Sequence, residues 1–181
     1  MTTTKQAFSI VPVSDSDIPK VMEINEECLP ENYPMHYFLY LYKSYPRSFL
    51  VAKIDSEIVG YIMCKVQPSR FTNKIPFLKR GPIGHIVSVA VQEPYRNMGI
   101  GEELVRQGLT ATSLSHNTKE YMLEVRVTNR AVNFYKRLGF EVERILRSYY
   151  NDGEDGYLMT RQSYTSDPDN IDNNDPDLIS P

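Results

Sequence analysis

The chain has 181 residues, 41% of them hydrophobic, and a formal net charge of −3. These values predict one soluble globular domain with a core of its own. No apolar run approaches the ~20 residues that cross a bilayer, and residues 1–6 lack the apolar segment of a signal peptide. The two cysteines, Cys28 and Cys64, lie in apolar segments and are interpreted as core thiols. Composition therefore argues against membrane attachment and disulfide-stabilised secretion, and favours the reducing cytoplasm.

The charge is distributed unevenly along the chain. Residues 166–181 contain five aspartates and no lysine or arginine. Since the whole chain has 23 acidic and 20 basic residues, residues 1–165 carry a net charge of +2. The acidic segment has too little apolar surface to order itself, so we expect a folded domain over residues 1–165 and a disordered tail over residues 166–181.

The first third of the chain predicts a strand, two helices and a hairpin. Residues 7–13 alternate as a strand, and Ser14 and Asp17 have the spacing of a capping box before an apolar helical stripe. Pro30 ends that helix, and a rigid loop leads into an aromatic helix over residues 35–45. Residues 48–54 and 58–66 are rich in β-forming side chains, and the polar residues 55–57 between them predict a hairpin.

The middle of the chain contains a long loop and then a strand, a glycine turn and a helix. Residues 67–81 include four basic residues and no acidic one. Residues 84–91 have the pattern of a buried strand, and apolar residues recur at helical spacing over residues 102–114. Between these two elements lies the run Arg96-Asn97-Met98-Gly99-Ile100-Gly101.

A strand that turns through two glycines into a helix leaves backbone N–H groups without partners at the helix start, where the helix dipole is positive. Such a turn is a site for phosphate, and Arg96 adds a positive charge at its mouth. The plainer interpretation is a glycine turn that only connects two elements. Neither the P-loop motif nor the dinucleotide-binding glycine motif is present.

The last third of the chain predicts a strand, a short helix and two closing strands. Residues 120–127 form the strand, and residues 130–138 form a helix that ends at Gly139. Residues 142–149 and 156–161 form strands on either side of a polar, glycine-containing turn. The complete order, β-α-α-β-β-β-α-β-α-β-β, predicts an α/β domain with a mixed sheet and helices on both faces.

Several motifs together resemble the GNAT superfamily of N-acetyltransferases. The run from Arg96 to Gly101 is similar to its R/Q-x-x-G-x-G/A loop, and Phe134-Tyr135-Lys136-Arg137-Leu138-Gly139-Phe140 is similar to a second superfamily segment. Residues 29–33, 84–88 and 149–155 narrow the resemblance to protein N-terminal acetyltransferases, especially the archaeal enzymes and the catalytic subunit of the type A complex. The resemblance covers residues 7–162 and implies a mixed central sheet of about seven strands.

The resemblance implies that acetyl-CoA is the cofactor and that CoA is a product. The residues implied to bind it are Val89, Ala90 and Val91 on a strand, and Arg96, Asn97, Met98, Gly99, Ile100, Gly101 and Glu102 in the glycine loop. Tyr135 matches the position near the thioester sulfur, where a phenol can donate a proton to the leaving thiolate. Asn129 matches a coenzyme ligand, although its spacing to Tyr135 is one residue shorter than the family pattern.

Acetyl transfer to an α-amino group, whose pKa is about 8, is aided by a base. His85 and Glu124 match positions implicated in deprotonation, and a carboxylate within an apolar strand needs a partner or a function. The alternatives are a structural His–Glu pair, or Glu124 paired with Arg126 or Arg147. His85 and Glu124 could also collect adventitious zinc, but two ligands make an incomplete site, so no functional metal is predicted.

The resemblance assigns acceptor recognition to two loops. Glu31 and Tyr33 lie in the loop between the first two helices, and Tyr149 and Tyr150 precede the last strand. Tyrosine hydroxyls can hold peptide backbone without selecting side chains. A carboxylate at Glu31 resembles the type A pattern, which implies small first residues such as Ser, Ala, Thr and Gly.

The leading hypothesis is an N-α-acetyltransferase that acts on protein N-termini, with Met-initiated termini as a further substrate class. The enzyme alternative is acetylation of lysine side chains or small-molecule amines on the same fold. The non-enzyme alternative is a coenzyme-binding or ribosome-docking subunit, which the basic loop of residues 67–81 would suit. No sequence-specific nucleic-acid partner is predicted, and the sequence leaves the oligomeric state open.

Overall fold

The structure is a computed structural model, which describes residues 7–68 and 81–163. The predictions for the acidic tail and for most of the basic loop concern residues outside these ranges. Within the described ranges no helix is long and apolar enough to cross a membrane.

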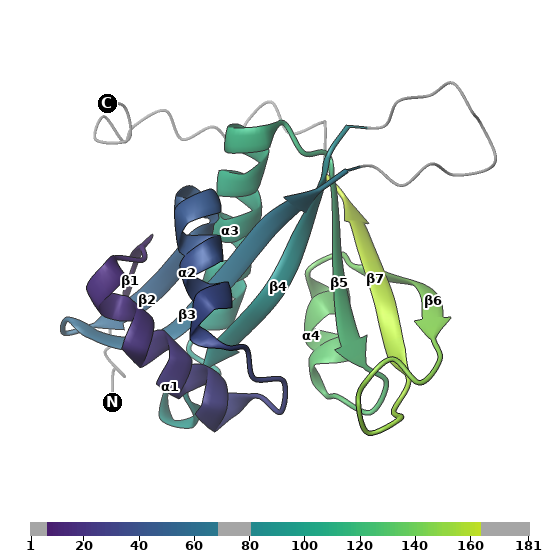
Figure 1. Ribbon diagram of the computed structural model, residues 1–181, viewed down its shortest axis with the longest axis horizontal. Coiled ribbons are helices and arrows are strands. Elements are labelled where there is room, and N and C mark those ends of the chain that lie inside the picture. The colour runs from purple at the N-terminus through teal and green to yellow at the C-terminus, as the bar shows by residue number, and fades with distance from the viewer. Residues whose placement is uncertain (1–6, 69–80, 164–181) are drawn as a thin grey trace, which may run out of the picture.

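The described residues form seven strands and four α-helices, in the predicted order (Figure 1). The elements are β1 (Ser9–Pro12), α1 (Ile18–Cys28), α2 (Met35–Ser44), β2 (Phe49–Ile54), β3 (Glu57–Gln67), β4 (Ile83–Val91), α3 (Ile100–His116), β5 (Glu120–Arg126), α4 (Ala131–Arg137), β6 (Glu141–Leu146) and β7 (Gly156–Gln162). Short 3-10 turns precede α1, β2 and α3.

The strands form one mixed sheet in the order β1-β2-β3-β4-β5-β7-β6. All neighbouring pairs are antiparallel except β4 and β5, which are parallel. The long α3 helix connects these two strands, as a parallel crossover requires. The predicted α/β class and the seven-stranded mixed sheet are therefore confirmed.

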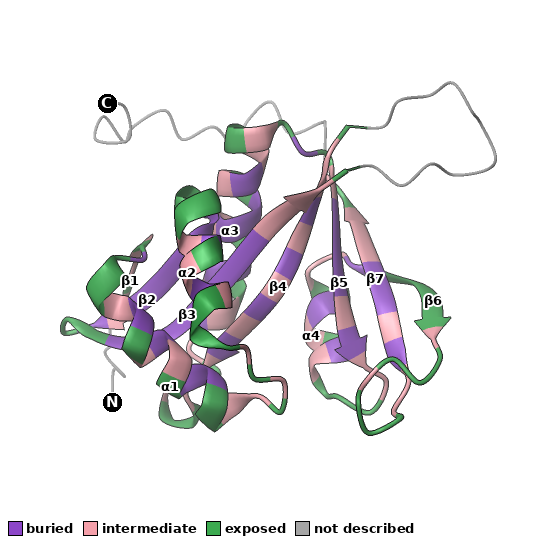
Figure 2. Cartoon of the chain, viewed as in Figure 1, coloured by how far each residue is buried: buried purple, intermediate pink, exposed green. Residues whose placement is uncertain are grey.

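Helices cover both faces of the sheet and create two cores. The side chains of α1 and α2 pack with Phe49, Val51 and Tyr61 on one face. On the other face α3 and α4 pack against a second cluster, which includes Ile62, Leu104 and Leu123. Figure 2 shows the resulting alternation of buried and less buried residues along β4.

Local sequence signals determine where several elements begin and end. The predicted capping box forms: the Ser14 N–H donates to Asp17 Oδ2 at 2.9 Å. Gly139 ends α4 with φ +80°, a left-handed conformation that favours glycine. The α3 helix begins at Ile100, two residues earlier than predicted, directly after Gly99. By contrast, β6 ends at Leu146, because the Ser148 N–H leaves the strand to donate to Asp155 Oδ1 at 2.8 Å.

The parallel strands β4 and β5 pair over a short stretch and then separate. Their register joins Ile83, Gly84 and His85 to Glu120, Tyr121 and Met122, all at one end of the strands. Glycine is needed there, because a Cβ on Gly84 would lie only 2.6 Å from the Tyr121 ring. Beyond His85 the two strands diverge, as Figure 1 shows, so the sheet is split for the rest of their length.

Candidate active site

Two cavities lie along the split between β4 and β5. The first, here called the Glu124 cavity, has a volume of about 860 Å³ and is bounded by the loop after α1, by β4 and β5, and by the loop between β6 and β7. The second, the glycine-loop cavity, has a volume of about 960 Å³ and is bounded by the end of β4, the turn before α3, and α4. Leu29, Val89, Asn129, Ala131 and Tyr135 line both cavities.

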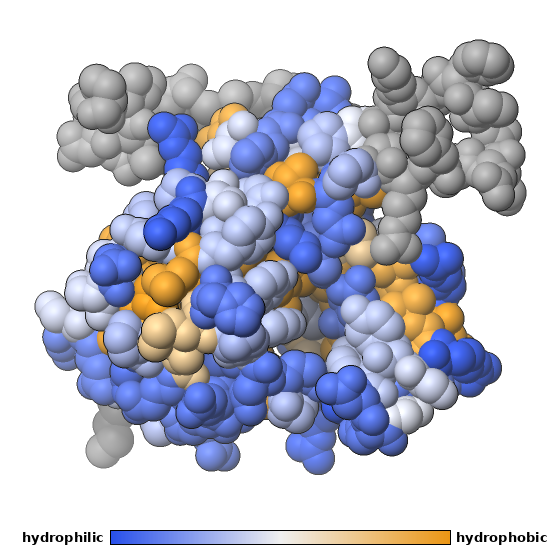
Figure 3. All heavy atoms as spheres, viewed as in Figure 1, coloured by the Kyte–Doolittle hydropathy of each residue, from blue (hydrophilic) through white to orange (hydrophobic). Residues whose placement is uncertain are grey.

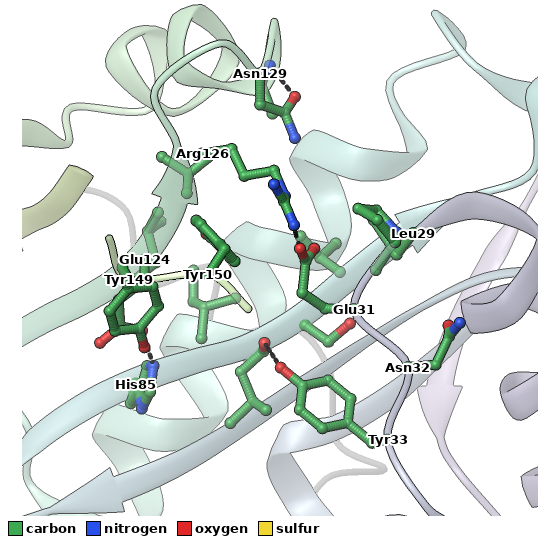
Figure 4. A pocket seen from close by; sticks show the side chains of 18 of the residues that line it. Leu29, Glu31, Asn32, Tyr33, His85, Glu124, Arg126, Asn129, Tyr149 and Tyr150 are labelled. Atoms are coloured by element: carbon green, nitrogen blue, oxygen red, sulfur yellow. Dashed lines mark hydrogen bonds and ion pairs between the residues drawn. The ribbon is translucent and has the colours of Figure 1, made fainter. Parts of the chain in front are cut away.

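A β-bulge in β4 shapes the wall between the cavities. Met63 of β3 lies opposite Ser88, but the next residue, Cys64, lies opposite Ile86, so Val87 is an extra residue in β4. The carbonyl oxygen of Val87 accepts a hydrogen bond from the Tyr33 hydroxyl at 3.3 Å. This bond ties the loop after α1 to the bulged strand (Figure 4).

A buried polar network centred on Asn25 also holds the loop after α1 in place. Asn25 of α1 donates to the Tyr61 hydroxyl at 2.9 Å and to the Glu31 carbonyl oxygen at 3.2 Å, and its side-chain oxygen accepts from the Tyr33 N–H at 3.4 Å. Tyr61 in turn shares a 2.7 Å hydrogen bond with Ser88 in the bulge. Sequence reasoning missed this network, because a single buried Asn in a helix has no characteristic pattern.

His85 and Glu124 meet in the Glu124 cavity, as predicted. His85 Nε2 lies 2.7 Å from Glu124 Oε2, and the two side chains are only 12% and 14% exposed. The other ring nitrogen, Nδ1, lies 2.5 Å from the side-chain nitrogen of Gln67. Neither Arg126 nor Arg147, the partners considered for Glu124 in the alternative interpretation, pairs with it; both bind other carboxylates.

Arg126 is the centre of a charge cluster that the sequence analysis did not assign to the site. Its guanidinium binds Glu31 at 2.8 Å, and Asp152 and Glu154 at 2.7 Å each. The Tyr150 ring lies 4.2 Å from the guanidinium carbon, a cation–π contact. Figure 4 shows Glu31 and Arg126 reaching toward each other across the Glu124 cavity. Glu31 is therefore ion-paired within the protein. The sequence analysis had considered it only as a residue that recognises the acceptor.

The alternation of β5 explains why Glu124 and Arg126 lie together. Tyr121, Leu123 and Val125 are buried in the core cluster that α3 and α4 share with the sheet, while Glu124 and Arg126 alternate with them and line the cavity. The even spacing of Glu124 and Arg126 near the end of β5 was the available sequence signal for Arg126.

The tyrosines predicted to hold the acceptor all line the Glu124 cavity. Tyr33 is mostly buried, and burial raises its pKa to about 12, with Tyr37 and Glu31 acting in the same direction. Burial likewise raises the pKa of Tyr150, and nearby Glu31 adds to the shift. Tyr149, in contrast, is 48% exposed at the cavity rim. The partly buried phenols of Tyr33 and Tyr150 therefore stay protonated at neutral pH and are able to donate hydrogen bonds.

The glycine-loop cavity has the features expected of an anion site. Gly99 has φ +88° and open space where a Cβ would lie, and Arg96 donates through Nε to the Val91 carbonyl oxygen at 2.9 Å. The first-turn N–H groups of α3 lack partners within the helix. Among the predicted residues, Val89, Ala90, Val91, Asn97, Gly101 and Glu102 also line the cavity. Ile100 is buried in the core and Met98 packs beside it, so these two residues can contribute backbone groups.

Tyr135 and Asn129 line both cavities, and Cys28 lines the glycine-loop cavity. Tyr135 is buried, and burial raises the pKa of its hydroxyl well above the ordinary value. Asn129 accepts a 2.8 Å hydrogen bond from the Ala131 N–H, which caps the start of α4. Cys28 was predicted to be a core thiol, but it is partly exposed and lines the glycine-loop cavity, with its sulfur 3.7 Å from the Val91 carbonyl oxygen. Cys64 is buried, as predicted.

The described residues contain no group of three or more His, Cys, Asp or Glu side chains that could hold a metal ion. Around the cavities, the surface of the face in Figure 3 is mostly hydrophilic, whereas hydrophobic residues gather over β7 and β6. The site is thus a polar split between two strands, with a titratable pair on one side and a glycine loop on the other.

Comparison with known families decides how this site is classified. The model of the acetyltransferase (GNAT) family matches residues 18–140, which span the split, the glycine loop and α4. The chain belongs to the acetyltransferase (GNAT) family.

Relatives of this GNAT chain cover most of its length. An N-alpha-acetyltransferase of Sulfurisphaera tokodaii is 45% identical over 147 residues, 80% of this chain and 86% of that protein. The catalytic subunit ard1 of the N-terminal acetyltransferase A complex of Schizosaccharomyces pombe is 35% identical over 93% of both chains. The crystal structure of Chaetomium thermophilum Naa20 in complex with a bisubstrate analogue has a TM-score of 0.75, with 30% identity over 86% of each chain.

The charge cluster of this GNAT chain yields a testable pH dependence. Hydrogen bonds from the Glu154 N–H and from Arg126 lower the pKa of Asp152, and those from Thr128 and Arg126 lower the pKa of Glu154. We expect Arg126→Leu to raise both pKa values, but not to their ordinary values, because the Glu154 N–H and Thr128 remain. Carbon-13 NMR titration of the labelled carboxyl groups measures this.

The matched control is Arg147→Leu, which should raise the pKa of Asp155 and leave Asp152 and Glu154 unchanged. A carboxylate with a lowered folded-state pKa adds stability above its unfolded value of about 4, and this stability is lost as pH falls through the folded value. Arg126→Leu should therefore reduce the free energy of unfolding more at pH 7 than at pH 3. Equal losses at both pH values would contradict the cluster.

Proposed function

We propose that this chain is an N-alpha-acetyltransferase, which transfers an acetyl group from acetyl-CoA to the free α-amino group of protein N-termini. The observation that carries the proposal is that two cavities meet at Tyr135 and Val89 in the split sheet, one with a His–Glu pair and one with a glycine loop. The N-alpha-acetyltransferases named among its relatives support the same reaction.

The glycine-loop cavity fits the pyrophosphate of acetyl-CoA. Arg96 binds Val91 through Nε, so its two terminal nitrogens are the donors that would reach a phosphate. The backbone N–H groups of residues 97–102 would provide further donors, and Val89, Ala90 and Val91 would pair with the rest of the coenzyme. When bound, acetyl-CoA supplies the acetyl group as a thioester.

The Glu124 cavity would hold the acceptor amine. An α-ammonium group must lose a proton before its nitrogen attacks, and the His85–Glu124 pair is placed to accept that proton. As the new C–N bond forms and the C–S bond breaks, the leaving thiolate needs a proton. Tyr135 would donate it, because burial raises its pKa and keeps the hydroxyl protonated until that step.

Acceptor selection would come from the two loops that close the Glu124 cavity. Glu31, held by Arg126, places a carboxylate where the first side chain would lie. Small or polar first residues such as Ser, Ala and Thr are favoured there, because a bulky apolar side chain would desolvate the carboxylate. Tyr33, Tyr149 and Tyr150 would contact the peptide backbone.

We place the reaction in the cytoplasm, where the two free cysteines of the described chain would stay reduced. Ribosome docking through the basic loop is part of the proposal, although residues 69–80 lie outside the described ranges. The direct test supplies purified protein with acetyl-CoA and matched peptides that begin with Ser or Met. A third peptide has a blocked N-terminus and one internal lysine. We expect the free termini, Ser first, to be acetylated; equal rates on the lysine peptide would overturn the substrate class.

Gly99→Val tests the anion site. The substitution forces a branched residue into a left-handed conformation and places a side chain in the open cavity, so we expect acetyl-CoA to bind roughly tenfold or more weakly. Loss of one hydrogen bond to a charged phosphate costs ~1.5–3 kcal/mol. Calorimetry measures the affinity.

Gly153→Val is the control for Gly99→Val, because Gly153 has φ +86° and equally open surroundings but lies outside the glycine-loop cavity. It should show the same backbone strain and keep its acetyl-CoA affinity. If a folded Gly99→Val protein binds acetyl-CoA as tightly as Gly153→Val, the loop is not the phosphate site.

His85→Ala and Glu124→Gln test the proton acceptor. Each should lower kcat by ~10²–10⁴-fold, the usual contribution of a general base, with acetyl-CoA affinity little changed. The pH optimum should move to higher pH, because the reaction then depends on amine that is already neutral, with a pKa of about 8. Steady-state rates across pH measure both effects. Wild-type kcat and pH profile in both variants would place the base elsewhere.

A further inference from the structure

The contacts of His85 bear on which member of the pair accepts the proton. His85 lies between two polar side chains from the neighbouring strands, Gln67 at the end of β3 and Glu124 on β5. The ring nitrogens are used separately: Nδ1 faces the Gln67 side-chain nitrogen at 2.5 Å and Nε2 faces Glu124 Oε2 at 2.7 Å. All three side chains are at least partly buried.

The two partners of the ring together indicate the protonation of neutral His85. Nδ1 is then the acceptor for the Gln67 side-chain nitrogen, because an ionised carboxylate such as Glu124 can only accept and the proton of the neutral ring must be on Nε2. That N–H then donates to the Glu124 carboxylate. Both ring nitrogens are thereby occupied, and neither is left to take a proton from the acceptor amine.

We propose that Gln67 is a positioning residue that stabilises the Nε2-protonated tautomer of His85, and that Glu124 is the group that accepts the proton. This inference rests on the proposed function and assigns separate roles within its catalytic pair. His85 holds Oε2 of Glu124, so Oε1 is the carboxylate oxygen that remains for the acceptor amine in the Glu124 cavity. His85 thus orients the base and does not itself receive the proton.

The other groups around the ring are compatible with this arrangement. Lys65, the cross-strand partner of His85, directs its amine to the Tyr37 hydroxyl at 3.2 Å. Tyr33 donates to the Val87 carbonyl oxygen. Among the contacts of the described residues, the Gln67 amide is therefore the group that can donate to Nδ1.

The tautomer can be measured directly, without substrates or turnover. Long-range proton–nitrogen NMR correlations of nitrogen-15 histidine rings distinguish a protonated from an unprotonated ring nitrogen. The chain has three histidines, and a His85→Asn variant assigns the signal. In the wild-type protein we expect His85 to be protonated on Nε2 and unprotonated on Nδ1. A neutral ring with its proton on Nδ1 would overturn the inference.

A kinetic cycle tests whether Gln67 acts through His85. Gln67→Met keeps the side-chain length but removes the donor, and should lower kcat by roughly five- to tenfold, as expected for one hydrogen bond, with KM for acetyl-CoA unchanged. In a His85→Ala background the same substitution should have no further effect. An equal loss in both backgrounds would show that Gln67 acts independently of His85 and would overturn the inference.

Gln107→Met is the matched control, because Gln107 donates to Glu103 on α3 at 2.7 Å and lines neither cavity. It should leave kcat and the His85 signals unchanged. The NMR measurement on wild-type protein holds even where a variant fails to fold. Failure of the proposed function would show instead as absent acetylation of free N-termini by the wild-type protein, so the two failures are distinguishable.

Discussion

The short pairing between β4 and β5 is the constraint on which the site depends. The strands share only the register from Ile83 to His85, and beyond it their facing edges no longer bond to each other. Backbone groups on such edges need other partners, since a buried unpaired N–H or C=O is costly. Side chains take some of them: Tyr33 binds the carbonyl of Val87, and Arg96 binds that of Val91. The remaining edge is where an extended ligand can pair with the sheet.

Along the gap between β4 and β5, side chains that are far apart in the sequence come into contact. Glu31 and Arg126 are 95 residues apart in sequence, yet their ion pair spans the Glu124 cavity. Asp152 and Glu154 bind the same guanidinium from the loop between β6 and β7. Three carboxylates around one guanidinium leave the cluster with excess negative charge at the edge of the Glu124 cavity. The side chain of Arg126 therefore connects the loop after α1 with the loop between β6 and β7.

The sequence predicted the features that depend on local patterns. Strand and helix order, the Ser14–Asp17 capping box and the left-handed Gly139 were all confirmed, because each depends on spacing within a few residues. The His85–Glu124 pair followed from the family resemblance and the adjacency of their strands, and the structure confirms their contact. The resemblance did not, however, reveal that Gln67 contacts the other ring nitrogen of His85.

The missed features depend on geometry that alternation does not encode. A period of two shows that Glu124 and Arg126 share a face, but it does not show which loop residues reach them. The Val87 bulge is a one-residue shift in register, visible only when both strands are aligned. Cys28 was predicted to be buried because its helix is amphipathic, but it lies at the helix end, where the split opens the glycine-loop cavity beside it.

The same alternation along β5 indicates which of its residues contribute to the core and which place charges in the Glu124 cavity. Its odd-numbered residues, Tyr121, Leu123 and Val125, are buried in the core, although Leu123 and Val125 also reach the cavity wall, whereas Glu124 and Arg126 are the charged residues of β5 that line the cavity. Substitutions of the first group should act on folding, and substitutions of the second on binding and proton transfer. The Glu31–Arg126 contact is an ion pair between partly exposed side chains, so a substitution that removes either charge should act on the Glu124 cavity and leave the two hydrophobic cores in place.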